Sequence, residues 1–311
     1  MAEPRVIAIF GPTASGKTAV AEALAERIPA RLVSADAMQV YRGVPILTNQ
    51  SGEPTELVAI WELDHEASVG EYAELAHRAI DSALDEGLTP LVVGGTGLYL
   101  RAALADLELP PAPPAGARER WQRAYDELGA GAAHEALAER DPEAAALIHP
   151  NDRRRVVRAL ELTETGSSLA PRHERLWSDE MRHPTLVVGL DVPKDELDRR
   201  IAERTRRMFE RGAAEEAGRA LAGRVSSTAR TIHGLQEAAE LPREEAIEAL
   251  TGRTRRYAAY QRKWMRRIPG LVSLPADRPP GEVADAILEV ARPRQRLPAG
   301  PARGPRRALD A

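Results

Sequence analysis

Residues 11–18 (GPTASGKT) have the residue types and spacing of a phosphate-binding loop, with two glycines separated by four residues and followed by lysine and threonine. Glycines let backbone N–H groups converge on phosphate oxygens, and the dipole of a following helix adds to the attraction. Lys17 would bring a positive charge to the terminal phosphate, and Thr18 would offer its hydroxyl to Mg²⁺. The predicted phosphate-binding residues are Gly11, Pro12, Thr13, Ala14, Ser15, Gly16, Lys17 and Thr18. The alternative is a glycine-rich turn that matches the pattern by coincidence.

A carboxylate near this loop would decide what chemistry follows. The default for such a loop is to bind a nucleotide such as ATP for hydrolysis or phosphoryl transfer, with an acidic strand end that holds Mg²⁺. The run PLVVGGTG (90–97) carries no carboxylate, whereas the run that ends at Ser34 is followed closely by Asp36. Asp36 could anchor magnesium as in a kinase, act as a base on an acceptor, or cap a helix. Local sequence leaves all three open.

The elements around these segments alternate between strand and helix patterns. Short apolar runs predict buried strands at 5–10, 31–34 and 90–93. Amphipathic runs predict helices at 18–27 and 72–86. Such alternation is typical of an α/β protein with a parallel sheet flanked by helices. Because ligands collect beyond the carboxyl ends of parallel strands, we expect three segments to meet at one edge of the sheet, namely 11–18, 34–41 and 94–99.

The rest of the chain divides at proline-rich and polar stretches. The run LPPAPP (109–114) predicts a stiff boundary, and helix formers follow it to about residue 166 with a break at 149–152. A last buried strand is predicted at 185–192, and helices at 194–222, 243–251 and 254–267. The final twenty residues are rich in proline and arginine and are expected to be disordered. The predicted segments are a first part of the α/β core at 1–112, a helical segment or insertion at 113–148, core completion with further helices at 149–275, and a tail at 276–311.

Composition limits the class of protein. The chain has 311 residues and 43% hydrophobic content, enough for a substantial core, and its absence of cysteine excludes disulfides and thiolate metal sites. No stretch looks like a signal peptide, and no apolar run approaches the roughly 20 residues that span a bilayer. We therefore expect a soluble cytoplasmic protein. A net charge of −4 argues weakly against a nucleic-acid partner, although the basic residues are clustered.

Five motifs together resemble the tRNA dimethylallyltransferase family, in its order and spacing. They are GPTASGKT (11–18), SADAMQVYRG (34–43), VVGGTGLYLRA (92–102), HPNDRRRVVRALEL (149–162) and TRRYAAYQRKWMRR (254–267). The resemblance implies a P-loop NTPase-like α/β fold with additional helical segments, whose helices at 149–275 include tRNA-binding ones, and a Mg²⁺ cofactor. We expect a monomer. It also implies transfer of a dimethylallyl group from dimethylallyl diphosphate, held in the loop, to N6 of the adenosine 3′ to the anticodon. That base would be flipped out of the tRNA anticodon stem-loop, and a longer prenyl donor stays open.

The resemblance also assigns roles to residues. Asp36 would accept the proton of the attacking amine, Thr13 would bond the leaving diphosphate oxygen, and Arg204 would neutralise the diphosphate. The predicted tRNA contacts are Asp36, Ala37, Met38, Gln39, Thr96, Arg118, Arg154, Arg155 and Arg158. The alternative for these arginines, and for Arg118 above all, is a surface salt bridge with one of the many glutamates.

Two segments depart from the family pattern. Bacterial members often have serine where Ala37 stands and DIGTAKP where this chain has VPILTNQ (44–50), which puts the acceptor-side detail in doubt. The second variant segment is TIHGLQE (231–237), and its His233 is expected to be structural. Trp264 is expected to lie in the core despite the basic residues around it. Three other functions stay open: an adenylate prenyltransferase, a small-molecule kinase and a non-catalytic RNA-binding module. The basic helices favour a macromolecular acceptor over adenylate.

Overall fold

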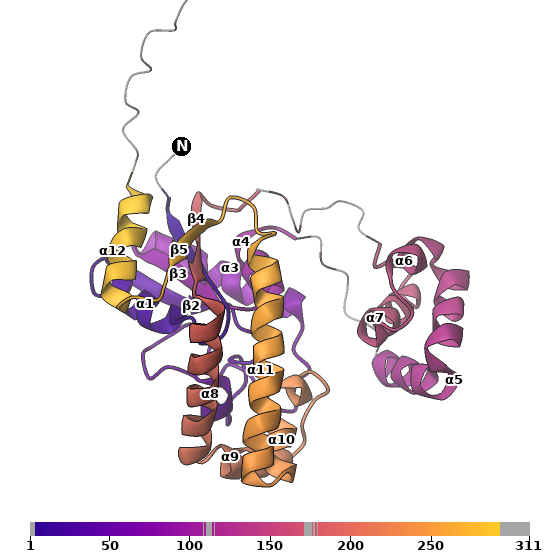
Figure 1. Ribbon diagram of the computed structural model, residues 1–311. Coiled ribbons are helices and arrows are strands. Elements are labelled where there is room, and N and C mark those ends of the chain that lie inside the picture. Colours follow the sequence, from indigo (N-terminus) through magenta and orange to yellow (C-terminus); the bar gives the residue numbers. More distant parts are fainter. Residues whose placement is uncertain are drawn as a thin grey trace, which may run out of the picture.

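The computed structural model describes residues 4–292 except 108, 110–113, 115, 171–175, 177 and 179. Its centre is a parallel sheet with strand order β2-β3-β1-β4-β5 (Figure 1). The strands are β1 (Val6–Phe10), β2 (Ala30–Ser34), β3 (Thr89–Gly94), β4 (Thr185–Asp191) and β5 (Val272–Pro275). The predicted α/β class is confirmed, and the prediction missed β5, which is short and only half-buried.

Both faces of β1 are buried, as its uninterrupted apolar sequence predicts. Ile7 and Ile9 pack on α1 (Lys17–Ala25) and α12 (Pro280–Ala291). Ala8 and Phe10 point to the opposite face and pack with α3 (Val69–Asp85) and α4 (Gly97–Leu104). This alternation fixes β1 in the middle of the sheet, so the loop that follows Phe10 emerges at the centre of the carboxyl edge.

Beyond this edge the chain builds a second helical layer. It contains α8 (Lys194–Glu210), α9 (Ala213–Leu221), a 3₁₀ turn η2 (Ala229–Thr231), α10 (Leu235–Glu240) and α11 (Arg243–Met265). Figure 1 shows α8 and α11 side by side, extending from the carboxyl edge of the sheet. The short helix α2 (Pro45–Thr48) packs on α9. The segments predicted as separate helices at 243–251 and 254–267 form one helix, α11, because the buried Leu250, Thr251 and Ala258 pack along its whole length.

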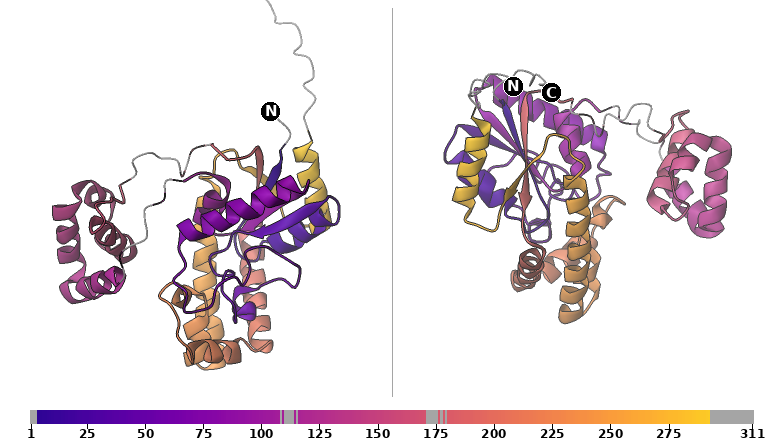
Figure 2. Two further views of the ribbon diagram at one scale, coloured as in Figure 1. Left: turned by 180° about the vertical axis from the view of Figure 1, so that it is seen from behind. Right: turned by 45° about the horizontal axis from the view of Figure 1, so that its top comes forward.

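Three helices form a core of their own, set apart from the sheet in both views of Figure 2. They are α5 (Ala117–Arg140), which is interrupted at Gly129, α6 (Pro142–Leu147) and α7 (Arg153–Thr163). Leu137, Ile148 and Leu160 are buried in this core, which we call the helical unit. The predicted helical segment at 113–148 therefore ends too early, because the apolar face of α7 packs on α5 and not on the sheet.

The predicted tail at 276–311 is wrong in its first part. Val283, Ala284 and Ile287 lie at helical spacing in α12 and are buried against α1. Arg27, in the turn after α1, pairs with Asp285 of α12 at 2.7 Å. The expectation of disorder concerns residues 293–311, which lie outside the described residues. Throughout the described part of the chain, every helix is too short or too polar to cross a lipid bilayer.

Candidate active site

The segment Gly11–Thr18 joins the buried end of β1 to the first turn of α1. Lys17 Nζ donates to the carbonyl of Pro12 at 2.9 Å, so the loop closes on itself. Ala14 and Gly16 both have positive φ, 64° and 90°, which is strained backbone for alanine and easy for glycine. A Cβ on Gly11 would lie 2.7 Å from the hydroxyl oxygen of Ser15, so any other residue here would displace that hydroxyl. The hydroxyl of Ser15 is buried and has no hydrogen-bond partner among the described residues. A buried, unpaired hydroxyl inside such a loop fits an anion that binds there.

Thr13 is held from two sides. Arg204 of α8 donates to the Thr13 hydroxyl oxygen at 2.8 Å, and the backbone N–H of Thr13 donates to Gln261 Oε1 of α11 at 2.8 Å. A guanidinium has no acceptor, so the hydrogen of the Thr13 hydroxyl is directed elsewhere. The arrangement gives one donor O–H and one adjacent cation at the same point, which suits an anionic leaving group.

Asp36 lies in the turn after β2, beside the end of β3. Its Oδ1 accepts from the backbone N–H of Met38 at 2.9 Å, which forms an Asx turn with no helix following, so the helix-cap interpretation is wrong. A Cβ on Gly94 would lie 2.0 Å from the carbonyl oxygen of Ala35, so only glycine allows this turn to approach β3. Within the described residues, Oδ2 of Asp36 has no hydrogen-bond partner and is available to an acceptor substrate.

The charges of the loop and of Asp36 act on one another. Desolvation lowers the pKa of Lys17 to about 8; the nearby carboxylate of Asp36 opposes this, and the Arg204 guanidinium adds to it. Desolvation likewise lowers the pKa of Arg204, against the effect of Asp36. A cavity of about 40 Å³ has Lys17, Thr18 and Asp36 in its lining. Two cations held partly dehydrated next to each other form a site that an anion stabilises.

Helix α11 lies over the glycine turn that follows β3. A Cβ on Gly95 would lie 2.2 Å from Gln261 Nε2, and one on Gly97 would lie 2.1 Å from the Trp264 ring. Gln261 Nε2 donates to the Gly95 carbonyl at 2.8 Å. The turn GGTG therefore has these glycines because α11 docks on them, a packing role that the motif alone did not reveal. Trp264 packs against the main core, as predicted.

With this geometry established, comparison with known proteins identifies the family. A family model described as IPP transferase matches residues 39–268, and one described as isopentenyl transferase matches residues 4–59. The chain is 41% identical over 279 residues to a tRNA dimethylallyltransferase of Streptomyces griseus, which covers 85% of this chain and 88% of the relative. It is 40% identical over 311 residues to one of Salinispora tropica, which covers 95% of each. The chain belongs to the tRNA dimethylallyltransferase family.

A solved structure supports the same assignment. The full-length tRNA isopentenylpyrophosphate transferase from Bacillus halodurans is 30% identical and aligns with a TM-score of 0.65, over 93% of this chain and 97% of that one. The five motifs that suggested this family from sequence fall at the sheet edge, in α7 and in α11. The resemblance stated from the sequence is therefore confirmed.

The predicted acceptor side of this family member is built around Thr96. Its hydroxyl oxygen accepts from the backbone N–H of Ala37 at 3.3 Å and lies 3.4 Å from the hydroxyl of Tyr257. Burial raises the pKa of Tyr257 and that of Tyr99 well above the ordinary value, and the charge of Asp36 contributes to both shifts. His233 packs edge-on against Tyr257 with ring centroids 4.5 Å apart, and burial lowers its pKa to about 4. The wall beside Asp36 is thus aromatic and neutral at physiological pH.

Gln39 has its amide engaged within the protein. Its Oε1 accepts from Ser34 Oγ at 2.9 Å, and its Nε2 donates to the carbonyls of Thr48 and Asn49 at 3.3 and 3.1 Å. The variant segment 44–50 is therefore tied to the turn that carries Asp36. Met38 is half-buried and packs against the main core, so of the predicted contacts at 36–39 the Asp36 carboxylate is the group left open.

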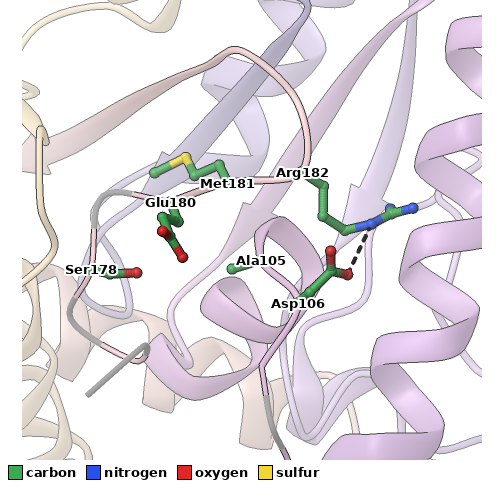
Figure 3. A pocket seen from close by; sticks show the side chains of 6 residues that line it. All are labelled: Ala105, Asp106, Ser178, Glu180, Met181 and Arg182. Atoms are coloured by element: carbon green, nitrogen blue, oxygen red, sulfur yellow. Dashed lines mark ion pairs between the residues drawn. The ribbon is translucent and has the colours of Figure 1, made fainter. Parts of the chain in front are cut away.

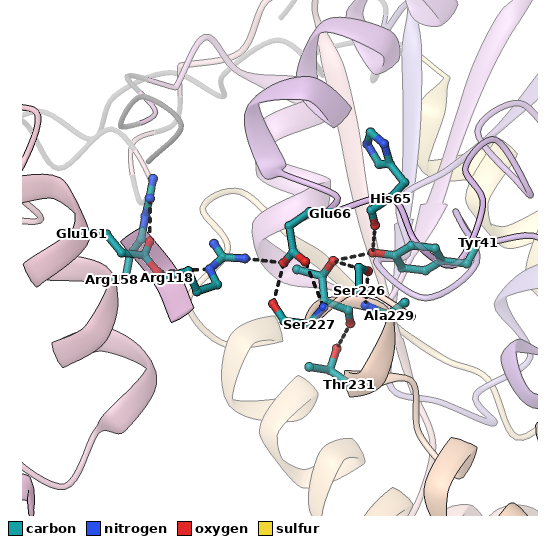
Figure 4. Close-up of polar contacts among 11 residues, drawn as sticks. Tyr41, His65, Glu66, Arg118, Arg158, Glu161, Ser226, Ser227, Ala229 and Thr231 are labelled. Carbon is teal, nitrogen blue, oxygen red and sulfur yellow. Dashed lines mark hydrogen bonds and ion pairs between the residues drawn. The ribbon is translucent and has the colours of Figure 1, made fainter. Parts of the chain in front are cut away.

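The four arginines predicted to bind tRNA all belong to the helical unit, but they differ in environment. Arg118 pairs with the buried Glu161 at 3.1 Å and with Glu66 (Figure 4). Glu66 precedes α3 and belongs to the part of the molecule that contains the sheet, called the sheet side below. Arg158 also pairs with Glu161, at 3.0 Å. Arg154 and Arg155 are exposed at the start of α7, and the charge of Arg154 opposes the rise in the pKa of Tyr99 and Tyr257. The salt-bridge alternative holds for Arg118 and Arg158 in this structure, whereas Arg154 and Arg155 have no ion pair with any described residue.

A larger cavity, of about 320 Å³, lies away from this site. Its lining comes from Ala105 and Asp106, which follow α4, and from residues that precede β4. Arg182 pairs there with Asp106 at 3.3 Å (Figure 3). Because all strands of the sheet are parallel, the start of β4 lies at the edge opposite the phosphate loop. Size alone would therefore point to the edge opposite the phosphate loop.

Proposed function

We propose that the protein transfers a dimethylallyl group from dimethylallyl diphosphate to N6 of the adenosine 3′ to the anticodon of tRNA and releases diphosphate. The observation that carries this assignment is the placement of Asp36 in one small cavity with Lys17 and Thr18, next to Thr13 and Arg204. A phosphate loop whose neighbouring carboxylate keeps one oxygen open suits proton removal from an acceptor. Membership of the tRNA dimethylallyltransferase family supplies the nature of that acceptor.

The proposed reaction involves residues on both the diphosphate side and the acceptor side of the site. N6 of adenine attacks the allylic carbon, the carbon–oxygen bond to the diphosphate breaks, and its electron pair leaves on the diphosphate oxygen. The N6 proton passes to the open oxygen of the Asp36 carboxylate. Lys17 and Arg204 balance the charge of the leaving diphosphate, and the Thr13 hydroxyl, already held by Arg204, donates a hydrogen bond to the departing oxygen.

A magnesium ion fits the same place. Thr18 lines the cavity beside the loop and offers the hard oxygen ligand that Mg²⁺ prefers. Thr18 would hold the ion together with the diphosphate, and the ion would supply further neutralisation of the leaving group. The protein's own residues would still orient the loop, accept the proton and exclude water.

The acceptor side fits a base extruded from a single-stranded loop. The aromatic wall of Tyr99 and Tyr257 is neutral and next to Asp36, which suits stacking and a site shielded from water. The exposed Arg154 and Arg155 would bind backbone phosphates, and Arg118 would join them by exchanging Glu66 for a phosphate. We further propose that the enzyme acts as a monomer in the cytoplasm, an environment that a chain without cysteine fits.

One assay tests the assignment against its competitors. The protein is incubated with Mg²⁺ and labelled dimethylallyl diphosphate, with an anticodon stem-loop or with AMP, and ATP turnover is measured in parallel. We expect label in the stem-loop. Label in AMP alone would instead identify an adenylate prenyltransferase, and ATP turnover without transfer would identify a kinase. Stem-loop binding with neither activity would leave an RNA-binding module.

A further inference from the structure

Gln261 connects two parts of the site that sequence places far apart. It is only 3% exposed, and its amide group is bonded at both atoms. Oε1 accepts from the Thr13 backbone N–H and Nε2 donates to the Gly95 carbonyl, each at 2.8 Å. A peptide N–H can only donate and a carbonyl can only accept, so the orientation of this amide is fixed by its partners. The link joins the loop after β1 to the turn after β3.

The surroundings show that this link is built into the fold. Any side chain at position 95 would occupy the place of Nε2, since a Cβ there would lie 2.2 Å from that atom. Among the genetically encoded side chains, glutamine alone offers an amide donor and acceptor at this reach. Asparagine is one methylene shorter, and glutamate lacks the donor when ionised.

Each partner of Gln261 leads directly to one half of the proposed reaction. Thr13 contacts Arg204 and belongs to the segment Gly11–Thr18 that we propose binds diphosphate, called the diphosphate loop below. Gly95 precedes Thr96, whose hydroxyl oxygen accepts from Ala37, the residue after Asp36. A chain of single contacts therefore runs from the leaving-group side through Gln261 to the turn that carries the general base.

We propose that Gln261 is a positioning residue that sets the separation between the diphosphate loop and the Asp36–Thr96 side of the site. It contacts neither substrate, and it acts by holding the allylic carbon and the attacking amine at the distance the reaction needs. This role rests on the proposed prenyl transfer. A misplacement of about 1 Å can lower a rate roughly 100-fold, so an effect on turnover is expected without loss of binding.

Two substitutions separate positioning from simple support of α11. Gln261→Met keeps the volume and removes both hydrogen bonds. We expect kcat for stem-loop prenylation to fall about 10- to 100-fold, with KM for donor and stem-loop changed less than about threefold. Thr251→Val is the matched control, because it changes another buried polar residue of α11 whose hydroxyl has no partner among the described residues. Its kcat should equal that of the wild type.

Gln261→Glu adds a readout that a structural role would not move. The carboxylate can still accept from Thr13, but its second oxygen would face the Gly95 carbonyl. Protonation restores a donor there, and burial raises the pKa of a carboxyl group. The ratio of the kcat of Gln261→Glu to that of the wild type should therefore rise as pH falls.

Two results would overturn the role of Gln261 while the wild type is active. One is a kcat within twofold of the wild type in a folded Gln261→Met. The other is a pH-independent ratio for Gln261→Glu, which holds as evidence even where Gln261→Met does not fold. Absence of transfer by the wild type to any acceptor would instead overturn the proposed function on which this role rests.

Discussion

The diphosphate loop and the helical unit are held in opposite ways. The loop is fixed by buried contacts from α8 and α11 and by its own lysine, with Thr13 bonded on both its backbone and its side chain. The helical unit meets the sheet side through Arg118 and Glu66, both partly exposed, and Glu66 in turn accepts from the backbone and hydroxyl of Ser227 at 2.9 and 2.6 Å (Figure 4). The first arrangement suits a reaction centre with fixed geometry, and the second suits a surface that exchanges partners when RNA binds.

The largest effect should come from the general base. Asp36→Asn keeps the shape and the acceptor for the Met38 N–H but cannot take the proton, so we expect kcat to fall about 10³-fold. Stem-loop affinity, measured by filter binding, should stay within about threefold because the RNA phosphates are bound elsewhere. Asp64→Asn, which changes an exposed acidic residue before α3, is the control. Full activity of Asp36→Asn would refute the assignment of the base.

A smaller loss should follow from the leaving-group side. Thr13→Val removes the hydroxyl that accepts from Arg204, and we expect kcat to fall about 10²-fold, as for loss of one donor to a developing anion. Thr13→Ser, which keeps the hydroxyl, should recover most of the rate. Single-turnover kinetics with labelled donor measure the chemical step directly. Equal rates for the valine and serine variants would show that the hydroxyl takes no part.

The same contrast explains what the sequence could predict. The residues of the diphosphate loop, Asp36 and the glycine turn are each recognised from a few neighbouring positions, because each directly follows a buried strand. Gln261 could not be assigned its role, because its partners become neighbours only when α11 docks on the glycines. Arg118 could not be assigned either, since the same basic residue suits a glutamate or a phosphate equally. The α12 helix was missed because its Pro279-Pro280 start resembles a linker, although proline is tolerated in a first turn.

The pKa of Lys17 makes the loop sensitive to pH. The pKa of Lys17 in the folded protein, about 8, lies below the ordinary 10.5. The buried loop therefore destabilises the charged form of Lys17 relative to the unfolded chain. That unfavourable contribution is complete below about pH 8 and disappears as pH rises toward 10.5. A bound diphosphate favours the charged lysine and raises the pKa of Lys17. Diphosphate binding at a pH between about 8 and 10.5 should therefore be accompanied by uptake of a proton. Calorimetry in buffers of different ionisation enthalpy should detect this uptake in the wild type and in the control Lys263→Met, and its persistence in Lys17→Met would rule out Lys17 as its source.

The smallest effect should come from the exposed link to the helical unit. If Arg118 exchanges Glu66 for an RNA phosphate, weakening this pair should favour the bound state. Glu66→Gln should therefore raise stem-loop affinity, by up to about fivefold, since an exposed ion pair is worth about 1 kcal/mol or less. Arg118→Met should lower the affinity instead. Glu62→Gln is the matched control, because it breaks an exposed pair with Arg42 that lies wholly on the sheet side.

The salt dependence separates this exchange from a structural loss. Arg118→Met removes one cation from the RNA contact, so the slope of log affinity against log salt should decrease by about 1. Glu66→Gln leaves every cation in place and should keep the slope of the wild type while shifting the whole line upward. A lower affinity for Glu66→Gln would mean that the pair holds the helical unit in its RNA-binding position, and the link would then resemble the contacts of the diphosphate loop.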